Sequence, residues 1–146
     1  MSLQVSPPTT MFPIRRALRS IGAVVAGIAV GAVLSLGTDQ ALHELNVYPP
    51  WGQPMAGAGL YLLALGYRLA DTVLGAYVTA RLAPAAPSAH VWVLAAIGFA
   101  VCTAGVVANG FMPELGPLWY PVALAILSVP ATWAGGCLYR PPIAKR

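Results

Sequence analysis

Three charged side chains lie within or at the edge of long apolar runs of the chain: Arg68, Asp71 and Asp39. An ionisable residue at membrane depth is costly, and it is therefore a default candidate for a functional site. Asp71 follows Arg68 by three residues, a spacing that places both on one face of a helix. Asp39 is an alternative partner, because a long arginine side chain can reach along the bundle. The pattern predicts an intramembrane ion pair or transport site and leaves the partner of Arg68 open.

Two further polar residues, His43 and Asn109, stand near the ends of apolar runs, on the side where Asp39 is expected. Together they could form an outer polar vestibule above Arg68. Histidine titrates near neutral pH, so this vestibule is one candidate for a proton or ion path. The alternative is an ordinary helix end with local hydrogen bonds. Both interpretations are kept.

Motifs for metal binding, cofactor binding and catalysis are missing from the sequence. It contains no C-x-x-C, H-x-x-x-H, H-E-x-x-H, G-x-S-x-G or phosphate-binding loop. His43 and His90 are expected at opposite membrane faces and cannot share a metal. The sequence therefore predicts no metal, no cofactor and no catalytic residue, and it disfavours an enzyme.

The composition decides the class of protein. Of 146 residues, 58% are hydrophobic and only 8% are charged, whereas a soluble domain carries about 25% charged residues. A disordered chain would also be rich in charge. The sequence indicates an integral membrane protein with the lipid bilayer as its main partner. The net charge of +4 needs no nucleic-acid partner, because basic residues also meet anionic lipid headgroups.

Four apolar runs are each long enough for a helix to cross a hydrocarbon core of about 30 Å. Backbone groups in lipid must be satisfied internally, so the runs should be helices, and the short loops between them favour antiparallel neighbours. The sequence predicts an all-α, four-transmembrane-helix antiparallel bundle over residues 17–140. Its helices are expected at about 17–40, 57–79, 90–110 and 118–139. Residues 1–16 are expected to form a disordered or interfacial cytoplasmic tail, and residues 141–146 a basic cytoplasmic tail.

The basic residues predict the orientation. All of them except Arg68 fall on one side of the predicted bundle: Arg15, Arg16, Arg19, Arg81, Arg140, Lys145 and Arg146. By the positive-inside rule both termini should be cytoplasmic. A basic segment followed by the apolar run 21–37 is also typical of a signal peptide. That run is long for one and lacks an Ala-x-Ala cleavage site, so we expect an uncleaved first helix.

Small residues recur at helical spacing inside the apolar runs, where they let helix backbones approach closely. Five glycines are predicted to pack helices: Gly27, Gly31, Gly98, Gly105 and Gly135. The G-x-x-x-G pair of Gly27 and Gly31 fits either a contact within the chain or a dimer seam. Pro130 lacks an N–H and crowds the preceding turn, so it predicts a kink in the fourth helix.

Several segments resemble a group of small, uncharacterised bacterial four-helix membrane proteins. They are YPPWGQPM at 48–55, Tyr67-Arg68, GAYVTARLAP at 75–84, GPLWYP at 116–121 and PATWAGG at 130–136. The resemblance covers roughly residues 19–138. It implies a multi-pass protein of the bacterial inner membrane with the same topology, and it brings no activity.

Two functional hypotheses follow. The sequence favours a membrane subunit or scaffold that packs with itself, as a homodimer, or with a larger membrane complex. The alternative is a small homo-oligomeric transporter or channel that uses Arg68, Asp71 and Asp39.

Overall fold

The computed structural model describes residues 11–53 and 55–140, and most of them are helical. The helices are α1 (Met11–Glu44), α2 (Ala58–Leu82), α3 (Pro87–Phe111) and α4 (Trp119–Leu138), with a short 3-10 helix η1 (Pro113–Leu115) before α4. No strand occurs in these described ranges. The prediction of an all-α chain with four long helices is confirmed for the described part of the chain.

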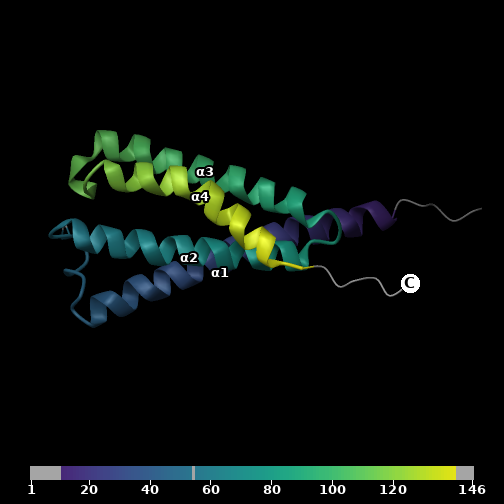
Figure 1. Ribbon diagram of the computed structural model, residues 1–146, viewed down its shortest axis with the longest axis horizontal. Helices are drawn as coiled ribbons and strands as arrows, with labels where there is room; N and C mark the ends of the chain where they lie inside the picture. Colours follow the sequence, from purple (N-terminus) through teal and green to yellow (C-terminus); the bar gives the residue numbers. More distant parts are fainter. Residues whose placement is uncertain (1–10, 54, 141–146) are drawn as a thin grey trace, which may run out of the picture.

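Helix α1 is longer than predicted. It begins at Met11 rather than near residue 17 and continues to Glu44, so residues 11–16 belong to a helix and not to a separate tail. Residues 15–19 are all alanine, leucine or arginine, which are good helix formers, so the helix begins before the apolar run does. Figure 1 shows the N-terminal end of α1 extending beyond the other three helices. Residues 1–10 and 141–146 of the expected tails lie outside the described residues.

The helices form two antiparallel hairpins, α1 with α2 and α3 with α4 (Figure 1). The closest packing joins α1 to α2, α2 to α4 and α3 to α4, whereas α1 and α3 share few contacts. Helix α2 therefore holds the two hairpins together. Along the described residues α1 and α4 do not pack against each other, and the α1–α3 side of the bundle is the loosest.

Two glycines allow α1 and α2 to approach closely. A Cβ atom added at Gly75 would lie 2.6 Å from the carbonyl oxygen of Gly27, and one added at Gly27 would lie 2.5 Å from that of Gly75 and collide with the Thr79 hydroxyl. Real Cβ atoms do not come this close, so any side chain here would push the helices apart. Gly31 is looser, with Asp71 O 3.6 Å from its added Cβ. The Gly27–Gly31 motif thus serves a contact inside the chain.

The fourth helix continues through Pro130 and changes direction in its second half (Figure 1). Proline lacks the N–H that would bond the carbonyl one turn earlier, which loosens the helix at that point. The nearby hydroxyls of Ser128 and Thr132 bond to the carbonyls of Ala125 and Ser128, at 2.9 and 2.7 Å. Beyond the bend Gly135 meets α2, where a Cβ would collide with the carbonyl oxygen of Val73.

The third helix does not use its glycines for packing within the chain. A Cβ added at Gly98 or Gly105 would find nothing within 4 Å, so the expectation that they pack against another helix of the chain is not met. Helix α3 instead buries Val91, Leu94 and Ala95. Val91 packs against Gly136 of α4, where an added Cβ would lie 2.8 Å from one of its methyl groups. Leu94 joins Ala76 and Val24 in the apolar core.

Candidate functional site

The partner of Arg68 is Asp39. Arg68 projects from the middle of α2, and its Nη2 atom lies 2.7 Å from Oδ2 of Asp39, which lies near the end of α1. The Asp39 side chain is 9% exposed and that of Arg68 is 36% exposed. This is the one ion pair among the described residues. Of the two partners left open by the sequence, the structure selects the one on the neighbouring helix.

Two tyrosines complete the surroundings of this ion pair. The Tyr67 hydroxyl donates a hydrogen bond to Oδ1 of Asp39. The hydroxyl of Tyr48 lies 3.5 Å from that of Tyr67 and 3.4 Å from the carbonyl oxygen of Leu60. Both carboxylate oxygens of Asp39 are therefore occupied, as a buried carboxylate requires. The cluster joins α1, the loop after it and α2.

These tyrosines were missed in the sequence because their surroundings are tertiary. The position of Tyr48 beside two prolines is typical of an aromatic residue at the membrane interface. In the structure it is buried, with 3% of its surface exposed. Tyr67 is the immediate neighbour of Arg68, and adjacent residues on a helix point in different directions. The sequence held one weak indication of this role, which is that Tyr67 is adjacent to Arg68. A tyrosine hydroxyl beside an arginine can donate a second hydrogen bond to the carboxylate that the arginine binds.

Asp71 has a separate environment. It is 8% exposed, and its Oδ2 atom accepts a hydrogen bond of 2.8 Å from the Ser35 hydroxyl of α1. No basic side chain lies within 4.0 Å of it in the described part of the chain. Charged groups that leave water are normally paired. Asp71 therefore stands apart from the Arg68–Asp39 pair as a buried carboxyl group held by one hydroxyl.

Asp71 lines an open cavity of about 260 Å³ to which all four helices contribute lining residues. Polar or polarisable side chains reach it from three of them: Thr72 of α2, Cys102 of α3, and Ser128 and Thr132 of α4. Gly31 supplies part of the α1 wall. The hydroxyls of Thr72, Ser128 and Thr132 each donate to a carbonyl of their own helix, so their oxygen atoms remain acceptors. The cavity thus combines one carboxyl group with several neutral oxygen atoms.

His43 and Asn109, the residues of the predicted outer vestibule, each have a local partner. His43 Nδ1 bonds the carbonyl oxygen of Asp39 one turn earlier, at 2.7 Å, and its ring stacks on Trp51 with centroids 3.9 Å apart. Asn109 donates to the carbonyl oxygen of Gly116 at 3.0 Å. Helix α2 lies between the ends of α1 and α3 that carry these residues (Figure 1). Each side chain therefore has a local partner, as the alternative interpretation expected.

No group of three or more His, Cys, Asp and Glu side chains that could hold a metal ion occurs among the described residues. Both carboxylate oxygens of Asp39 have hydrogen-bond donors, and Asp71 is the only carboxylate or imidazole among the described residues that line its cavity. The described residues of the site therefore offer one carboxyl group, that of Asp71, beside the hydroxyl groups of Ser35, Thr72, Ser128 and Thr132.

The class of protein follows from the helices. Within the described residues, three are long and apolar enough to cross a membrane: 14–44 of α1, all of α3 and all of α4. Helix α2 is as long as α3, at 25 residues, but Arg68 and Asp71 lower its hydropathy. These helices indicate a helical membrane protein. Comparison with protein-family models, curated proteins and solved structures finds no match to this chain.

Proposed function

We propose that the chain crosses a bacterial inner membrane four times, with both termini in the cytoplasm. The fourth crossing is α2, which packs against α1, α3 and α4 and turns Asp71 inward and Arg68 toward Asp39. Pairing offsets much of the cost of placing charge in the bilayer. The arginines at the start of α1 and the ends of α2 and α4 support this orientation. The bacterial origin follows the resemblance over residues 19–138.

Within this bundle, the proposed function is transport or conduction of protons or small cations through Asp71, in a homo-oligomer. The observation that carries the proposal is the environment of this residue: a buried carboxyl group, without a basic partner among the described residues, in a cavity reached by all four helices. Carboxylates inside membranes mark ion pathways and proton relays.

Arg68 and Asp39 have a different role in this proposal. Their ion pair joins α1 to α2 on the outer side of the Asp71 cavity, and each of the two charged groups balances the charge of the other. Arg68 therefore does not neutralise Asp71, which is free to exchange a proton or a cation. A change at Arg68 would act through the position of α1, whereas a change at Asp71 would remove the binding group.

The test is flux into proteoliposomes that hold a pH-sensitive or cation-sensitive dye. The chain should give flux above that of empty vesicles, and Asp71→Asn should abolish it while the protein still inserts. Glu44→Gln is the matched control, because Glu44 is an exposed carboxylate at the end of α1. Flux that survives Asp71→Asn would reject the site. The absence of proton, sodium and potassium flux in the unmodified chain would reject the function.

The membrane-subunit or scaffold function is the second candidate. It is supported by the outer face of α3, where Gly105 is exposed and a Cβ added to it would meet nothing within 4 Å. Small residues on a lipid-facing surface allow a second helix to approach closely. Purification in mild detergent tests this candidate. A larger membrane partner in fixed stoichiometry, lost in Gly105→Leu, would favour it over transport.

A further inference from the structure

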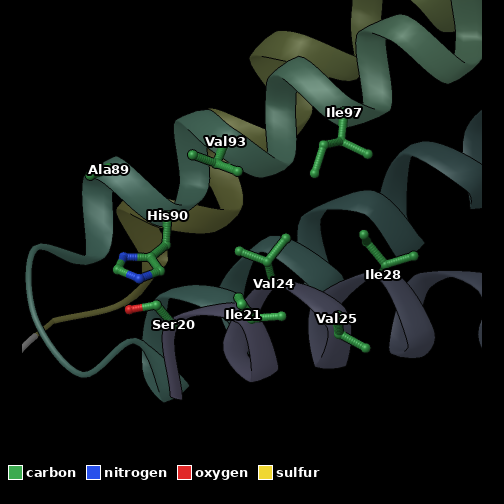
Figure 2. A pocket seen from close by; sticks show the side chains of 9 residues that line it. All are labelled: Ser20, Ile21, Val24, Val25, Ile28, Ala89, His90, Val93 and Ile97. Carbon is green, nitrogen blue, oxygen red and sulfur yellow. The ribbon is translucent and has the colours of Figure 1, made fainter. Parts of the chain in front are cut away.

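An apolar groove runs between α1 and α3, where the bundle is least tightly packed. The groove has a volume of about 400 Å³. Aliphatic side chains of both helices line it, and Ser20 and His90 lie at one end (Figure 2). From Ser20 to Ile28 helix α1 rises about 12 Å at ~1.5 Å per residue. One leaflet of the hydrocarbon core is about 15 Å deep. The groove therefore has the length of most of a leaflet.

Basic side chains gather at the Ser20 end of this groove. Arg15, Arg16 and Arg19 of α1 line a neighbouring open cavity of about 770 Å³, together with Pro84 and Ala85 of the loop that leads into α3. Arg16 lies one turn before Ser20, on the same face of α1. The four acidic residues of the chain are Asp39, Glu44, Asp71 and Glu114. None of them belongs to this end of α1 or to the start of α3, so the arginines form a concentrated positive charge.

We infer that this groove and its arginines form a binding site for one anionic phospholipid of the cytoplasmic leaflet. The phosphate group meets Arg15, Arg16 and Arg19, and one acyl chain lies between Ile21 and Val25 of α1 and Val93 of α3. Charge complementarity selects this occupant, because an anionic headgroup beside an apolar tail matches an arginine cluster beside an apolar groove. Basic pockets between transmembrane helices on the cytoplasmic side bind anionic headgroups in this way.

The position of the groove gives the bound lipid a consequence. Ile28 and Ile97 line both the groove and the cavity that contains Asp71, so the two spaces adjoin. An acyl chain in the groove would therefore close the side of the Asp71 cavity that opens between α1 and α3. The lipid site itself does not depend on transport by Asp71.

The experiment is native mass spectrometry of the full chain in detergent, titrated with phosphatidylglycerol or with phosphatidylcholine of the same acyl chains. We expect one phosphatidylglycerol to bind at least about tenfold more tightly than phosphatidylcholine, from three arginines near one phosphate. The triple change Arg15→Gln, Arg16→Gln, Arg19→Gln should remove this preference, whereas Arg81→Gln should retain it. Equal binding of the two lipids, or a preference that survives the triple change, would overturn the proposal.

The acyl-chain part needs its own variant. Val93→Phe places a ring in the groove, and Val107→Phe adds the same ring on α3 outside it; both valines are exposed, so each variant should fold. Val93→Phe should weaken phosphatidylglycerol binding, and Val107→Phe should not. Equal effects would show that the tail lies elsewhere. In a chain with Cys102→Ser and Cys137→Ser, a disulfide between two copies of Val93→Cys in vesicles would assign the groove to a second copy and reject the lipid.

Discussion

Nη2 of Arg68, in the middle of α2, lies 2.7 Å from Oδ2 of Asp39, near the end of α1, and this contact joins the two helices. The same carboxylate accepts the hydroxyl of Tyr67, so one side chain of α1 engages two consecutive residues of α2. Toward the loop the hairpin opens (Figure 1). The ion pair is therefore placed where the glycine contacts no longer hold the helices together.

Removal of one partner of this ion pair should cost more than removal of both. Asp39→Leu leaves the Arg68 guanidinium without its carboxylate, and a lone charge in an apolar setting is strongly destabilising. We expect a loss of about 2–4 kcal/mol in the single variant. The double variant Asp39→Leu, Arg68→Leu should recover a large part of it. Thermal unfolding in detergent measures both, and additive losses would contradict the paired arrangement.

The two tyrosines of the cluster should differ in their contribution. Tyr67→Phe removes a donor to the buried Asp39 carboxylate and should cost about 1.5–3 kcal/mol, as hydrogen bonds to charged groups do. Tyr48→Phe should cost less, because its hydroxyl contacts are long, at 3.4 and 3.5 Å. Both changes keep the ring and its packing. Unfolding by urea or heat would show which variant loses more free energy of unfolding. A larger loss in Tyr48→Phe than in Tyr67→Phe would refute this description of the site.

The glycine contact between α1 and α2 predicts opposite results for two alanine substitutions in one helix. Gly27→Ala should destabilise the protein by about 1–3 kcal/mol, the usual cost of overpacking, because its Cβ would collide with Thr79 and Gly75. Gly22→Ala should be neutral or stabilising by up to about 1 kcal/mol, since alanine is the better helix former and its Cβ meets nothing within 4 Å. If Gly27→Ala were as stable as Gly22→Ala, the two backbones would not be in contact.

The proposed orientation predicts which face exposes Cys137. This cysteine is exposed near the end of α4, whereas Cys102 is partly buried on α3. In a Cys102→Ser background, a membrane-impermeant maleimide should label Cys137 in inside-out vesicles and leave it unlabelled in intact cells. The reverse pattern would place the termini outside. A Cys137→Ser chain serves as the control for labelling at Cys102.

The order and number of the helices could be predicted from the sequence because they depend on local properties. Runs of about 20 apolar residues separated by proline and glycine specify four helices without any knowledge of their neighbours. The exception is the start of α1, where the predicted boundary near residue 17 followed the apolar run. The helix continues to Met11 because its formation depends on helix propensity as well as hydropathy.

The sequence by itself also singled out Arg68, Asp71 and Asp39, which lie within or at the edge of its long apolar runs. Their partners were decided by tertiary structure alone. Arg68 and Asp71 share a helix face, yet Arg68 reaches across to Asp39 and Asp71 bonds Ser35. The separation of α1 from α3, which opens the apolar groove between them, is likewise tertiary. Spacing along one chain determines which residues share a face, whereas contact between faces depends on how closely two helices approach.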